Sequence, residues 1–93
     1  MTKTTNPNAD NHPISVVFVV TGTEVKLRVK PDEVLGDALD LALKKSKNTG
    51  QPIDKWEVKN EAGELLAIGA SFAALGLGDG SVLFATLSAG AAG

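Results

Sequence analysis

The chain closes with GSVLFATLSAGAAG, residues 80–93, which begins as an apolar, β-prone run and ends in small side chains. We expect a strand over Val82–Leu87, because this run follows the turn signal GDG at 78–80. Residues 88–93 carry no side chain larger than that of serine, so ordering them would recover little of its entropic cost. The stretch predicts a final strand that continues into a thin, flexible tail ending at Gly93. The alternative is a frayed terminus without a role, the usual fate of a chain end.

Length and composition limit the function. The chain has 93 residues, of which 43% are apolar and 22% are charged, as expected for one small globular domain. A formal net charge of −2 gives no electrostatic reason to expect nucleic acid or an acidic membrane as a partner. The sequence has no cysteine, which excludes disulfides and thiolate chemistry, and no apolar run long enough to span a membrane. We expect a cytoplasmic protein without a cofactor or metal.

The first half of the chain predicts an arm followed by a hairpin. Residues 1–13 are polar and predict a disordered arm, whose lone His12 is expected to be solvated. Ile14–Val20 is predicted as a strand that is apolar on both faces, and Glu24–Lys30 as a strand with strict alternation. The short break between them favours a hairpin. The outward basic row of the second strand is either a contact for an acidic partner or a solvated sheet face.

One long helix is predicted after the hairpin. Asp32 is a candidate N-cap, and the apolar stripe that follows predicts a helix over Glu33–Lys47. Asp40 and Lys44 are spaced for an ion pair on its exposed side. The helix is expected to end before Pro52.

The second half predicts short elements and no catalytic centre. Lys55–Asn60 and Glu64–Leu66 are predicted strands, with Trp56 pointing into the core. Ser71 is expected to cap one helical turn through Leu75. The sequence offers no nucleophile–base pair and no metal cluster, so we expect the chain not to be an enzyme.

The order of these elements predicts an α+β fold. A single helix has to cover the sheet, because no other long element carries a matching apolar stripe. The final strand is expected beside the first strand, parallel to it, in the middle of the sheet. This is a β-grasp architecture, a mixed sheet of four or five strands packed on one α-helix, with residues 14–88 as the domain and 89–93 as its tail.

Four segments resemble the ubiquitin-like family. They are the hairpin followed by Pro31 and the helix, the loop GQPID at 50–54, the turn NEAGEL at 60–65, and the approach LGLGDGSVLF at 75–84. The likeness covers residues 14–93 and rests on order and spacing. It is nearest to the bacterial ubiquitin-like proteins encoded beside E1-like, E2-like and metalloprotease partners.

This resemblance implies a protein modifier. An E1-like enzyme would adenylate the carboxylate of Gly93, an E2-like enzyme would receive the chain, and a target amine or hydroxyl would accept it. A deconjugating protease would complete the set of partners. The flexible segment before Gly93, here called the neck, would consist of Ala89, Gly90, Ala91 and Ala92. Gly90 is an alternative mature end if a protease trims the tail.

The sequence departs from the family pattern in three places. Ala92-Gly93 replaces the diglycine end, and no arginine occupies the neck. Charged Glu57 and Lys59 replace the usual exposed aliphatic patch, which disfavours generic ubiquitin-binding domains. Glu64 stands at the position of the main linkage lysine. The candidate acceptors for chain formation, with ordinary surface lysines as the alternative, are Lys44, Lys45 and Lys47.

A partner surface is predicted from the first and last strands. If these strands are adjacent, the face away from the helix would carry an apolar patch, and such a patch usually marks an interface. We predict that this patch consists of Val17, Val19, Leu83, Ala85 and Leu87. The opposite parity of the last strand would expose Val82 and Phe84 instead.

Two other classes of function remain open at this stage. A sulfur carrier shares the β-grasp and the glycine end, but carries a C-terminal thiocarboxylate for cofactor biosynthesis. A non-conjugated interaction module would use the domain alone and have an inert tail.

Overall fold

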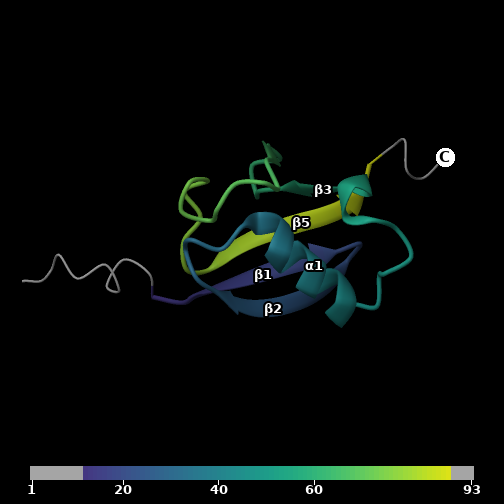
Figure 1. Ribbon diagram of the computed structural model, residues 1–93, viewed down its shortest axis with the longest axis horizontal. Coiled ribbons are helices and arrows are strands. Elements are labelled where there is room, and N and C mark those ends of the chain that lie inside the picture. The colour runs from purple at the N-terminus through teal and green to yellow at the C-terminus, as the bar shows by residue number, and fades with distance from the viewer. Residues whose placement is uncertain (1–11, 89–93) are drawn as a thin grey trace, which may run out of the picture.

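The computed structural model describes residues 12–88, which form a five-stranded sheet and one α-helix (Figure 1). The elements in chain order are β1 (Ile14–Val20), β2 (Thr23–Val29), α1 (Leu35–Lys45), η3 (Ile53–Lys55), β3 (Trp56–Lys59), β4 (Leu65–Leu66) and β5 (Ser81–Leu87). The strand order is β2-β1-β5-β3-β4. The predicted α+β fold, a mixed sheet with one helix in a ubiquitin-like β-grasp, is confirmed.

The two central strands are β1 and β5, and they run parallel. All other pairs in the sheet are antiparallel, and the β1–β2 hairpin turns through Thr21 and Gly22, which both have positive φ. Positive φ at both positions matches the twist of a tight hairpin. Because β1 and β5 are parallel neighbours, the start of β1 and the end of β5 lie at opposite ends of the sheet (Figure 1).

The core lies between the sheet and α1. Strand residues at alternating positions meet the apolar stripe of the helix, which confirms the predicted inward faces of β1, β2 and α1. Trp56 is also buried as predicted, although its indole N–H has no hydrogen-bond partner within residues 12–88. The largest fully buried side chains are Phe18, Phe72, Leu35, Leu39, Leu83, Val16, Val20 and Val58.

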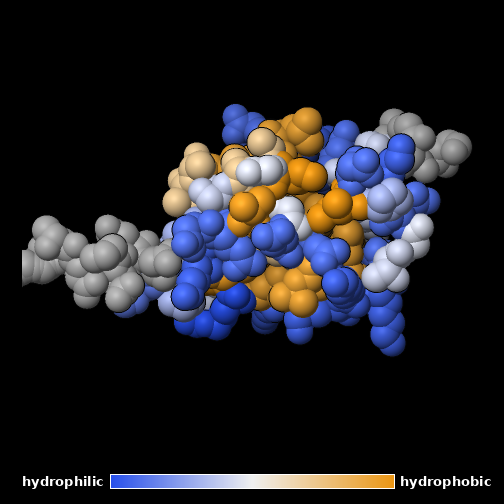
Figure 2. Space-filling view, in the orientation of Figure 1, coloured by the Kyte–Doolittle hydropathy of each residue, from blue (hydrophilic) through white to orange (hydrophobic). Residues whose placement is uncertain are grey.

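The surface around α1 alternates in character. In Figure 2, hydrophilic residues lie between hydrophobic ones on the face that shows the helix. The predicted ion pair is present there, with 3.0 Å between Lys44 Nζ and Asp40 Oδ2. Both side chains are more than half exposed, so this pair adds little stability. None of the helices within residues 12–88 is long and apolar enough to cross a membrane.

The N-terminus of α1 is capped differently from the prediction. Asp32 is not the N-cap: Val34 occupies that position, and no side chain caps the helix. The N–H groups of Leu35 and Gly36 instead donate to the carbonyls of Ala70 (2.8 Å) and Ile68 (2.7 Å). These bonds satisfy donors that a helix start would otherwise leave free. The loop at 68–70 therefore caps the helix, in place of the carboxylate of Asp32 that was predicted to do so.

Gly36 makes this close approach of the loop feasible. A Cβ at position 36 would lie 3.0 Å from the carbonyl oxygen of Ile68. Gly36→Ala is expected to lower the free energy of unfolding by about 1 kcal/mol, because displacing the loop weakens the two hydrogen bonds to its carbonyls by more than the gain in helix propensity. Urea denaturation with Asp32→Ala as control, which should cost less than about 0.5 kcal/mol, checks this. A stabilised Gly36→Ala, or a larger loss in Asp32→Ala, would contradict the capping scheme.

Candidate functional site

The predicted conjugation site lies beyond the described residues. Residues 89–93 are outside the described part of the chain, and they hold Gly93, the alternative end Gly90, and the neck residues Ala89, Ala91 and Ala92. The structure does fix the point from which they start. Strand β5 ends at Leu87, and the N–H of Ser88 donates to the carbonyl of Lys55 at 2.8 Å. Since β5 is bonded to β1 on one side and β3 on the other, the tail begins at a firmly held strand.

The predicted partner surface has to be corrected in β5. Leu83 and Ala85 are fully buried in the core, and Leu87 packs against the same core from its edge. These three residues therefore face α1 and not the outside. Val82 and Phe84 occupy the outer face, which is the opposite parity named as the alternative.

Strand register explains this parity. Phe18 of β1 is buried under the helix, and its partner in β5 is Leu83, so both point to the same face. One signal in the sequence could have given the answer. Within the predicted strand Val82–Leu87 the one polar residue is Thr86, which favours the outside for the set that also holds Val82 and Phe84.

Cross-strand partners define what the outer face carries. Val17 is paired with Val82, and Val19 with Phe84, so these four residues are neighbours on one face. We call Val17, Val19, Val82 and Phe84 the outer sheet patch. Phe84 is 39% exposed and the valines are half-buried. The patch is an apolar surface of the kind that commonly marks an interface.

Charged residues border the outer sheet patch on both sides. On the β2 side, Lys26 is the partner of Val17 and Glu24 that of Val19. On the other side, Lys59 of β3 is the partner of Phe84. Leu65 of β4 is in turn paired with Lys59 and is 63% exposed, a residue that the sequence analysis did not single out. An apolar centre with a charged rim is the usual composition of a protein–protein interface.

The candidate acceptor lysines lie at the end of α1. Lys44, Lys45 and Lys47 are exposed, and Lys44 is engaged with Asp40 in the ion pair described above. Lys47 follows the helix with a positive φ of 62°. Within residues 12–88 no three acidic or histidine side chains come together as a metal site would require.

Sequence comparison assigns the chain to a family. The family described as "Protein of Unknown function (DUF2604)" matches residues 9–93. A relative from Sinorhizobium fredii, "Uncharacterized protein y4jI", is 34% identical over 89 residues, which cover 90% of this chain and 68% of the relative.

Structural comparison finds the same fold in ubiquitin-like proteins. Ubiquitin from Caldiarchaeum subterraneum has a TM-score of 0.69 at 19% identity, and the match covers 83% of this chain and 95% of that one. The ubiquitin-like (UBL) domain of Dsk2 from Plasmodium falciparum has a TM-score of 0.66 at 23% identity, covering 83% and 100%. A designed protein based on ubiquitin gives a TM-score of 0.70 at 17% identity, with 83% and 90% covered.

Proposed function

Because this chain belongs to the DUF2604 family and its domain has the ubiquitin-like β-grasp fold, we propose that it is a protein modifier activated at Gly93. The observation that carries the proposal is the combination of this fold with a small-residue tail that follows the central strand β5 and ends in glycine. The domain would be held by its partners while the tail reaches their active sites.

The chemistry would take place on enzymes other than this chain. The Gly93 carboxylate would attack the α-phosphate of ATP on an E1-like enzyme and release pyrophosphate. A partner nucleophile would then displace AMP and take the acyl group, and an E2-like enzyme would pass it to an amine or hydroxyl of a target. A glycine at the reacting carbonyl leaves both faces open to the incoming nucleophile. We propose that the chain is the substrate of these reactions and not their catalyst.

We assign the outer sheet patch to the docking of these enzymes. The patch lies on the face opposite α1 and extends along β5 toward the tail. An enzyme bound there would be positioned to receive the residues that follow Ser88. The charged Glu57 and Lys59 on β3 would disfavour proteins that bind an aliphatic patch at this strand.

The proposal is tested by expressing the chain with an N-terminal tag in its native host. We expect tagged species of higher mass that survive denaturation, and we expect their loss when residues 89–93 are deleted. The deletion leaves β5 and the Ser88–Lys55 hydrogen bond in place, so the domain should remain folded by circular dichroism.

The same preparation separates the two other classes. A thiocarboxylate on the recovered chain, seen as the mass gain of sulfur replacing oxygen, together with the absence of adducts, would identify a sulfur carrier. If the deletion variant complements a gene knockout as well as the full chain does, the tail is inert and the domain is an interaction module. Either result would contradict the proposed conjugation.

A further inference from the structure

We propose that the β1–β2 side of the outer sheet face binds an acidic, extended peptide segment of a partner protein. This site shares Val17 with the outer sheet patch and adds the cations Lys26 and Arg28 of β2. The inference does not depend on conjugation of the tail, because it rests on residues of the folded domain alone.

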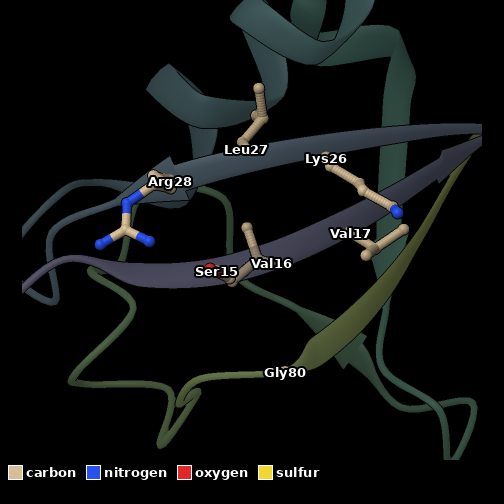
Figure 3. A pocket seen from close by; sticks show the side chains of 7 residues that line it. All are labelled: Ser15, Val16, Val17, Lys26, Leu27, Arg28 and Gly80. Atoms are coloured by element: carbon tan, nitrogen blue, oxygen red, sulfur yellow. The ribbon is translucent and has the colours of Figure 1, made fainter.

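A hollow of about 230 Å³ opens on this face (Figure 3). It lies over β1 and β2 and reaches Gly80, the residue that precedes β5. Val16 and Leu27 point toward the helix, whereas Val17, Lys26 and Arg28 point away from it (Figure 3). The lining of the hollow is mostly apolar, so the hollow can take an aliphatic side chain, and Lys26 and Arg28 belong to the same lining.

Lys26 and Arg28 supply the charge of this site. Both are exposed, and neither forms an ion pair with any residue between 12 and 88. They are two residues apart on one strand, which places their side chains on one face about 7 Å apart along it. This is also the spacing of alternate side chains in an extended peptide, so carboxylates at alternate positions of a partner segment could meet both cations.

The surrounding acids leave these cations available. Glu24 is the nearest acidic residue on β2, and it lies opposite Val19, beyond the hollow. The Asp79 carboxylate lies on the β5 side, where its Oδ1 accepts a hydrogen bond from the N–H of Ser15 at 2.7 Å. The lining of the hollow contains no carboxylate. The positive charge is therefore local, in a chain whose formal net charge is −2.

Charge complementarity and the apolar lining together favour an acidic peptide over a nucleic acid. Binding to a nucleic acid backbone relies on many phosphate contacts, whereas this site offers only two cations, beside an apolar hollow. A peptide that alternates carboxylates with aliphatic side chains satisfies both features. Val17 belongs to both the hollow and the outer sheet patch, so the same partner could extend across the two.

The experiment titrates the full chain with a fluorescein-labelled peptide of alternating aspartate and valine. We expect saturable binding that weakens with salt, since exposed charges are screened within about 10 Å at 0.1 M. In the amide NMR spectrum, the shifts should be concentrated at Ser15–Val17 and Lys26–Arg28 and at Gly80. The double variant K26E/R28E should weaken the affinity by about tenfold or more, because both attractions become repulsions.

The matched control is K45E/K55E, which makes the same change in net charge at exposed positions away from the hollow. It should retain the affinity within about twofold, and K26Q/R28Q should lie between the two double variants. An amide spectrum with native dispersion establishes that each variant is folded.

Four outcomes would overturn the proposal. They are an equal loss of affinity in both charge-reversed variants, equal binding of a peptide with asparagine in place of aspartate, tighter binding of a single-stranded oligonucleotide, and binding that appears only after residues 1–11 are removed. The last result would assign the hollow to the chain's own N-terminal segment.

Discussion

Gly93→Glu is expected to abolish covalent attachment of this chain to other proteins. The substitution places a bulky, charged side chain next to the carbonyl carbon that has to be attacked. A displacement of about 1 Å from the productive geometry can cost about 100-fold in rate, so activation should fall by at least that factor. The measurement is ATP–pyrophosphate exchange catalysed by the cognate E1-like enzyme in the presence of the purified chain.

Ala62→Glu is the matched control for this prediction. Ala62 lies on the exposed turn between β3 and β4, so the variant adds the same charge far from the tail. It should support exchange at the wild-type rate. If a protease trims the tail to Gly90, Gly90→Glu would show the loss and Gly93→Glu would not. Undiminished exchange with both glycine variants would rule out activation at either end.

Leu83→Asp and Phe84→Asp are expected to have opposite consequences, although the residues are adjacent in β5. Leu83 is fully buried in the core, so a carboxylate there would lose its hydration and leave a poorly filled space. We expect a loss of about 4 kcal/mol or more, a large part of the stability of a small domain. Phe84 is 39% exposed on the outer face, and its replacement should cost only about 1 kcal/mol.

The two variants also separate folding from partner binding. Phe84→Asp should keep a native amide spectrum yet fail to bind the activating enzyme, because it places a charge in the centre of the outer sheet patch. Chemical denaturation and a binding titration measure the two effects. A stable Leu83→Asp would contradict the register of β5 against β1, and unimpaired binding by Phe84→Asp would contradict the docking surface.

Much of the fold could be predicted because alternation and helical periodicity are local signals. The residues of β2 alternate strictly between buried and exposed positions, and α1 carries a continuous apolar stripe, so both elements were predicted within two residues of their ends. The parallel pairing of β1 with β5 followed from the order of elements, since other placements need longer connections. Burial of Trp56 followed from the alternation of its neighbours.

The features that could not be predicted depend on contacts between distant segments. The N-terminus of α1 is capped by carbonyls of the loop at 68–70, and no residue near Asp32 in the sequence predicts this contact. The parity of β5 is set by its register against β1, in which Leu83 meets Phe18. Because β5 is apolar at most positions, the polar Thr86 is only a weak signal for this parity in the sequence.

The hollow beside Lys26 and Arg28 illustrates the same limit. The sequence shows a basic row along β2, and from that alone a solvated sheet face is an adequate explanation. The apolar hollow next to these cations is formed by the packing of β1, β2 and Gly80, which the sequence pattern does not show. The combination of charge and recess indicates an acidic peptide as the ligand.

Peptide mass spectrometry of the adducts tests the central claim most directly. The sequence has no lysine or arginine after Lys59, so trypsin would leave residues 60–93 on a target; Ser88→Arg shortens this remnant to residues 89–93. The backbone bond from residue 88 to Lys55 is unaffected by the side chain. We predict target peptides that carry Ala-Gly-Ala-Ala-Gly on a lysine or hydroxyl side chain. Recovery of the tagged chain solely as a free protein, with no remnant on any other protein in the native host, would contradict the account.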